Sequence, residues 1–130
     1  MILVDSSVWI DYFEGVDAAH TRKLNSILGQ VDLATCDLIM AEVLQGYQKK
    51  SEFNDVLDVL DACRLIILGG RTVSVQAAKN YIYLRSVGFT VAKTLDTLIA
   101  TRCILSGHEL LHNDKDFRPF EQHLGLKCVI

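Results

Sequence analysis

Residues 2–7 read Ile2-Leu3-Val4-Asp5-Ser6-Ser7, three aliphatic side chains in a row that stop at an acid. Continuous rather than alternating apolar character is typical of a strand buried on both faces, as in a parallel sheet. Ser6 and Ser7 can cap a helix that carries Trp9 and ends at Gly15. A buried strand followed directly by a helix predicts an α/β domain.

The rest of the chain repeats this alternation. Helices are expected from Asp17 to the stop at Gly29, from Asp37 and Ser51 as caps, and over residues 72–87 and 91–106. Further short strands are expected at residues 31–34, 65–68, 110–111 and 127–130. Short apolar strands between helices predict an α/β fold around a short, mostly parallel sheet.

Length and composition narrow the possibilities. The chain has 130 residues, the length of one domain, so we expect residues 1–130 to form a single domain. Thirteen Lys and Arg against sixteen Asp and Glu give a net charge of −3, which argues against binding nucleic acid by bulk charge. No apolar run is long enough to span a membrane, and the acidic, leaderless start predicts a cytoplasmic location.

Five acids stand where solubility does not require them. Asp5 ends the first strand, and Asp114 and Asp116 follow a later one, so parallel central strands would bring these carboxylates together. Asp96 and Glu42 each interrupt an apolar stretch of a predicted helix. Taken singly, each acid has a structural explanation, as a helix cap, a dipole partner or a turn residue. Only the joint arrangement indicates a functional site.

Clustered carboxylates repel one another until a cation or a shared proton relieves the repulsion. Oxygen ligands alone favour a hard divalent ion, Mg²⁺ or Mn²⁺. Such an ion lowers the pKa of a bound water, neutralises a phosphate and stabilises a leaving oxygen. The pattern therefore favours phosphodiester hydrolysis, in which the ion supplies the positive charge that this acidic chain lacks.

Four motifs in order resemble the PIN domain: Asp5-Ser6-Ser7 after the first strand, Ala41-Glu42-Val43, residues 94–100 (Thr-Leu-Asp-Thr-Leu-Ile-Ala), and Asn113-Asp114-Lys115-Asp116-Phe117. The size is similar to that of the VapC-type toxins of toxin–antitoxin pairs. The resemblance implies a three-layer α/β/α fold and a metal-dependent endoribonuclease, commonly acting on transfer or ribosomal RNA. It also implies a cognate antitoxin as inhibitor and a homodimer.

The resemblance also assigns roles to residues. It implies that Asp5, Glu42, Asp96 and Asp114 form an acidic quartet around Mg²⁺ or Mn²⁺ that holds a metal-activated water, with Asp116 as an auxiliary acid. Ser6 matches a position usually occupied by Ser or Thr, whose hydroxyl would hold a metal-bound water. His112 stands where Thr is common in the family. Thr94 and Thr97 occupy positions around Asp96 that vary in the family. None of these differences removes a ligand, so the resemblance implies an active site.

A competing interpretation is a zinc metallopeptidase, because His108-Glu109-Leu110-Leu111-His112 matches the HExxH pattern. That chemistry requires both His on one face of a continuous helix, yet Gly107 breaks the preceding helix. In a strand, His108 and His112 would point to one side and Glu109 to the other. A non-catalytic PIN-like module that binds RNA or protein also stays open, since a sequence cannot show that metal is bound.

Other features favour structural explanations. Trp9, Tyr12 and Phe13 form an aromatic stripe that we expect to pack in the core, with an antitoxin groove or dimer contact as the functional alternative. We expect His20 and His123 at the surface. Four scattered cysteines without a CxxC pair are expected to act as small buried apolar residues. The densest basic pairs are Arg22-Lys23 and Lys49-Lys50.

Overall fold

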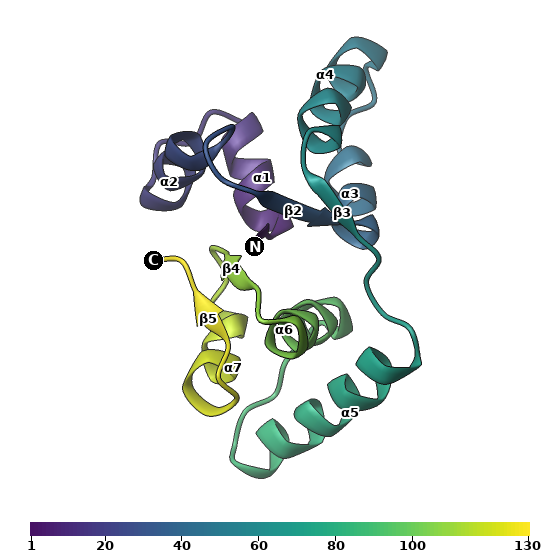
Figure 1. Ribbon diagram of the computed structural model, residues 1–130, viewed down its shortest axis with the longest axis vertical. Coiled ribbons are helices and arrows are strands. Elements are labelled where there is room, and N and C mark those ends of the chain that lie inside the picture. The colour runs from purple at the N-terminus through teal and green to yellow at the C-terminus, as the bar shows by residue number, and fades with distance from the viewer.

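The computed structural model describes all residues from 1 to 130 and contains one five-stranded sheet (Figure 1). The order across the sheet is β3-β2-β1-β4-β5, and every neighbouring pair is parallel, as the continuous apolar strands predicted. The strands are β1 (Ile2–Val4), β2 (Leu33–Cys36), β3 (Arg64–Ile66), β4 (Glu109–Leu111) and β5 (Lys127–Cys128).

Helices cover both faces of the sheet and make the three-layer α/β/α architecture. On one side, contacts link α1 to α2 and α3, and α3 to α4; on the other, α5 contacts α6 and α7 (Figure 1). The bounds are α1 (Ser6–Phe13), α2 (Ala19–Ile27), α3 (Asp37–Leu44), α4 (Lys50–Asp61), α5 (Arg71–Ser86), α6 (Thr94–Ser106), the 3₁₀ turn η1 (Lys115–Phe117) and α7 (Arg118–His123). Because βαβ crossovers are right-handed, reversing the direction of strand addition moves the helices to the opposite face.

The core is one cluster of 25 buried residues that spans both faces of the central strands. Leu3, Val4, Leu110 and Leu111 are fully buried, which is why β1 and β4 read as unbroken apolar runs. Trp9 is also fully buried, so the core interpretation of the aromatic stripe holds for its largest member. None of the helices is both long and apolar enough to serve as a membrane span.

Several predicted boundaries differ from the structure. Asp5, not Ser6 or Ser7, caps α1, because its carboxylate accepts a hydrogen bond from the Ser7 N–H. The helix expected from Asp17 starts at Ala19, and the strand expected at residues 31–34 lies at Leu33–Cys36. The helix expected from residue 91 begins at Thr94. The apolar pattern located the five strands and the helices α1 to α6 but neither η1 nor α7, and side-chain hydrogen bonds and turns set the ends of the elements.

Two other expectations need correction. His20 is buried rather than exposed, since its ring lies 2.7 Å from the Asp11 carboxylate and this contact joins α1 to α2. Cys36 and Cys103 are buried as predicted, but Cys63 and Cys128 are only partly so. A partly exposed thiol is available for chemistry that a core thiol is not.

Candidate functional site

The sheet reverses its order of strand addition beside β1, and the candidate site lies there. From β1 the chain adds β2 and β3 on one side, whereas β4 and β5 occupy the other. Ligand sites in open parallel sheets form at such a switch point, beyond the carboxyl ends of the strands. Asp5 directly follows β1 and its N–H donates to the Leu111 carbonyl 2.9 Å away, so the two strand ends are tied together.

Asp5 is almost completely buried, and only one of its carboxylate oxygens is satisfied. Oδ2 accepts from the Ser7 hydroxyl at 2.6 Å and from the Ser7 N–H at 3.1 Å. Oδ1 is buried without any hydrogen-bond partner. The Ser7 hydroxyl in turn accepts the N–H of Asn113 at 3.1 Å, so Ser7 links the end of β1 to the loop after β4.

Glu42 reaches the same region from α3. The buried Ser6 hydroxyl donates a hydrogen bond to the Glu42 carboxylate, so the first residue of α1 orients an acid on α3. Burial above all, and to a lesser degree the Glu42 charge, raises the pKa of Asp5. The Ser6 hydroxyl is thus occupied by its hydrogen bond to the Glu42 carboxylate.

Asp96 lies in the first turn of α6 and is 5% exposed. The helix dipole favours an anion at this position, yet burial and the nearby charges of Asp5 and Asp114 raise its pKa to about 7. Its Oδ2 atom is buried and has no partner. A carboxylate kept under such repulsion in the first turn of a helix is unusual for a residue whose role is structural.

The raised pKa of Asp96 predicts a pH-dependent stability in the absence of divalent ions. Between the ordinary value of 3.8 and about 7, the folded protein holds a proton that the unfolded chain has released. The free energy of unfolding therefore falls as the pH rises through this window, by up to about 4 kcal/mol. Urea unfolding in EDTA at several pH values measures it. The fall should shrink in Asp96→Asn, and an unchanged profile in that variant would contradict the assignment.

Asp114 and Asp116 complete the group. Asp114 caps η1 by accepting the Asp116 N–H at 2.9 Å, and its own N–H donates to the His112 ring at 3.1 Å. Asp96, Asp114 and Asp116 each offer a carboxylate oxygen, and these atoms lie within 4.8 Å of one another. Asp116, expected only as an auxiliary acid, therefore lies within the same cluster as Asp96 and Asp114.

The residues present fit a hard divalent cation. The carboxylates of Asp96, Asp114 and Asp116 converge, and Oδ2 of Asp96 itself and Oδ1 of Asp5 are buried acceptors without a partner, which a cation would satisfy. Unpaired buried carboxylates cost free energy, and a dication lowers that cost more effectively than water does. All the oxygens come from carboxylates, which matches Mg²⁺ or Mn²⁺ rather than a softer metal.

Basic residues lie beside this cluster that the sequence alone did not single out. Lys115 and Arg118 are exposed and line two hollows, one shared with Asp114 and the other with Asp116. Arg22 belongs to one of the basic pairs that stood out in the sequence. It forms an ion pair with Asp17 on the surface of α2. Lys115 and Arg118 did not stand out in the sequence because they are not adjacent. The turn of η1 into α7 brings them to the same surface.

The HExxH pattern does not form a zinc-peptidase helix. Gly107 ends α6 in the left-handed conformation, with φ of 72°, and Glu109–Leu111 is β4. Glu109 is exposed at the start of this strand. The metallopeptidase interpretation is therefore wrong in its structural premise.

Comparison with known proteins gives a consistent result. The PIN domain family matches residues 2–121 of the chain. Ribonuclease VapC11 of Mycobacterium tuberculosis is 27% identical over 131 residues, covering 99% of this chain and 98% of that protein.

Solved structures share the fold at lower identity. VapBC2 from Rickettsia felis, bound to a DNA fragment from its promoter, has a TM-score of 0.76 at 18% identity and covers 99% of this chain and 98% of that one. Mycobacterium tuberculosis VapC20, described as a toxin that cleaves the sarcin-ricin loop, has a TM-score of 0.65 at 15% identity, covering 91% of this chain and 93% of that one.

Proposed function

The chain belongs to the PIN domain family, and on that premise we propose that it is a metal-dependent endoribonuclease toxin of the VapC type, made of one PIN domain over residues 1–130. The observation that carries the proposal is the convergence of Asp96, Asp114 and Asp116 beside the buried, half-satisfied Asp5. The names of the relatives support the same class of activity. We also propose a cytoplasmic location.

We propose that Asp5, Glu42, Asp96 and Asp114 hold Mg²⁺ or Mn²⁺, with Asp116 as a further acid. A divalent ion bound there would supply Lewis-acid chemistry, which favours water as a nucleophile and neutralises charge on phosphate. Ser7 positions Asp5 and the Asn113 backbone, and Ser6 positions Glu42. These contacts fix the carboxylates before substrate arrives, so little reorganisation is needed during the reaction.

Incubating the purified protein with total small RNA and Mg²⁺, and then mapping the new ends, tests the proposal. Discrete cuts that disappear in EDTA are expected. The matched control is Glu109→Gln, which removes an acid of the HExxH pattern at the exposed start of β4 and should leave the rate within about twofold. Intact RNA under every ionic condition, from a protein that binds Mn²⁺, would favour the non-catalytic binding module.

Lys115 and Arg118 are proposed to contact RNA phosphates beside the acids. Replacing both with Ala should weaken RNA binding and reduce the slope of log affinity against log salt by up to about 1.4, since each phosphate contact on a single strand contributes about 0.7. Fluorescence anisotropy of a labelled RNA at several salt concentrations measures this slope. Arg22→Ala, on the surface of α2, is the matched control; if it changes the slope as much, the contact lies elsewhere.

The partners are proposals as well. A cognate antitoxin is supported by the fold shared with a toxin–antitoxin complex from Klebsiella pneumoniae, at a TM-score of 0.63 and 21% identity. We also propose a homodimer, for which α5 offers an apolar surface: Ile82 is 66% exposed and lies beside a hollow lined by Tyr81 and Leu98. Light scattering after gel filtration should report a dimer that Ile82→Lys converts to a monomer. A monomeric wild type would refute it.

A further inference from the structure

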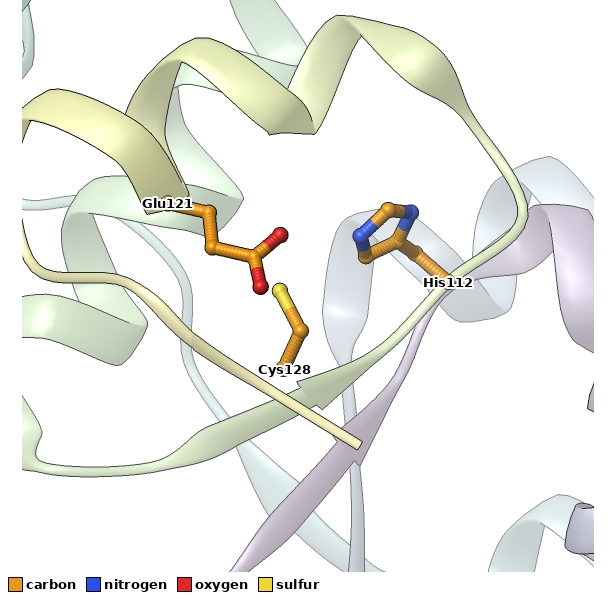
Figure 2. A group of neighbouring side chains, drawn as sticks. All are labelled: His112, Glu121 and Cys128. Carbon is orange, nitrogen blue, oxygen red and sulfur yellow. The ribbon is translucent and has the colours of Figure 1, made fainter. Parts of the chain in front are cut away.

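A second group of metal-ligating side chains lies apart from the carboxylate cluster, at the β4–β5 edge of the sheet. His112 follows β4, Glu121 is on α7 and Cys128 is the last residue of β5. One ligand atom from each lies within 4.8 Å of the others. Figure 2 shows the Cys128 sulfur against the Glu121 carboxylate and the His112 ring turned toward both. Three separate elements thus direct a nitrogen, an oxygen and a sulfur at one point.

We propose that His112, Glu121 and Cys128 form a binding site for a thiophilic divalent cation, Zn²⁺ above all. Nitrogen and sulfur ligands select zinc over Mg²⁺ or Mn²⁺, so this site and the carboxylate cluster prefer different ions. His112 and Glu121 both line one hollow that opens to solvent. This hollow has a volume of about 710 Å³. An ion therefore has a route to the site, and the fourth tetrahedral position is left for water.

The charges of the site match a dication. The Cys128 thiol gives its proton to solvent as the Sγ–metal bond forms, and the resulting thiolate with the Glu121 carboxylate supplies two negative charges. In the metal-free protein, burial and the adjacent Glu121 charge raise the pKa of the Cys128 thiol to about 12. A bound cation reverses that effect because it attracts the thiolate. The Cys128 thiol therefore stays protonated in the metal-free protein and becomes a thiolate ligand when a cation binds.

The His112 ring connects this site to the acid loop. Its Nδ1 accepts the Asp114 N–H at 3.1 Å, so in the neutral ring the proton is on Nε2. A metal at Nε2 displaces that proton to Nδ1, where it faces the Asp114 N–H and breaks the hydrogen bond. Zinc binding and the present position of Asp114 are therefore mutually unfavourable. The zinc site is independent of the proposed nuclease function, whereas an effect of zinc on RNA cleavage rests on that function.

Titration with Co²⁺ under a non-thiol reductant tests the site, because cobalt bound to a thiolate shows a near-ultraviolet charge-transfer band. One equivalent should produce the band, and Zn²⁺ should abolish it. Cys128→Ser should remove it, and the exposed Glu121→Gln, which leaves the core intact, should weaken Co²⁺ affinity by more than about 100-fold, since it removes a ligand rather than a side chain that supports one. Cys63→Ser and Asp96→Asn are the matched controls and should retain it. No band, or a band that persists in Cys128→Ser, would overturn the site.

The link to the acid loop has a separate readout. Saturating Zn²⁺ should slow Mg²⁺-dependent RNA cleavage by about fivefold to tenfold in the wild type, the value of one lost hydrogen bond, and not in Cys128→Ser. Equal slowing in both proteins would overturn the link, because the zinc would then act at the carboxylates. A wild type that shows the cobalt band but cuts no RNA would refute the nuclease proposal and support the metal site.

Discussion

Asp96→Asn is expected to abolish RNA cleavage while making the metal-free protein more stable. Loss of a side chain that merely supports a metal ligand costs about 10- to 100-fold, so loss of a ligand itself should cost roughly 1,000-fold or more. Asn keeps the size of Asp96 but removes the charge that burial, Asp5 and Asp114 disfavour. Removing this buried charge should raise the free energy of unfolding at pH 8 in EDTA by up to about 4 kcal/mol.

The two opposite effects make this prediction informative. A core residue with a purely structural role would lose stability on substitution, and its activity would fall only as the protein unfolds. Cleavage rates and urea unfolding of the same preparations measure both quantities. Asp55→Asn, on the exposed surface of α4, is the matched control and should change neither. An Asp96→Asn protein that cleaves as fast as the wild type would contradict the site.

Replacing Asp5 by Asn and by Ala should separate its two roles, as a proposed metal ligand and as the cap of α1. Asn retains an oxygen that can accept the Ser7 hydroxyl and N–H, so the cap of α1 survives while the charge is lost. We expect Asp5→Asn to lose cleavage by roughly 1,000-fold with a small change in stability. Asp5→Ala should lose cleavage equally and also about 1 kcal/mol or more of unfolding free energy, the usual cost of a missing cap.

Thermal unfolding and single-turnover cleavage of the two Asp5 variants provide the comparison. Ser7→Ala is a useful third protein, because it removes the hydroxyl bridge between Asp5 and the Asn113 N–H but leaves every carboxylate in place. Its cleavage should fall by about 10- to 100-fold. If Asp5→Asn cleaved normally and only Asp5→Ala were impaired, Asp5 would be a helix cap and nothing more.

The parts of this site that the sequence predicted are those fixed by strand order. Asp5 and Asp114 follow unbroken apolar runs, and parallel strands bring such positions to one edge of the sheet. Asp96 stood out because it interrupts apolar neighbours, and it is indeed buried. The inclusion of Asp116 in the cluster with Asp96 and Asp114 depends on the turn of η1, which apolar spacing does not encode.

The features that the sequence did not reveal depend on contacts between distant segments. The approach of Cys128 to His112 requires β5 to pair with β4, and both strands are too short for their register to be read from alternation. His20 is buried because Asp11, on the preceding helix, pairs with it. Neither contact leaves a periodic signal in the sequence. His20 was therefore expected at the surface and Cys128 in the core, the environments most common for these residue types.

The most direct test of the account follows bound metal and cut RNA in one sample. Mn²⁺ is added to metal-free protein with small RNA, free Mn²⁺ is followed by electron paramagnetic resonance, and cleavage is measured at each addition. We predict that binding and cleavage rise together with one midpoint, and that Asp96→Asn loses both. Cleavage that continues in EDTA, or persists in Asp96→Asn, would contradict the claim that these carboxylates form a metal-dependent nuclease site.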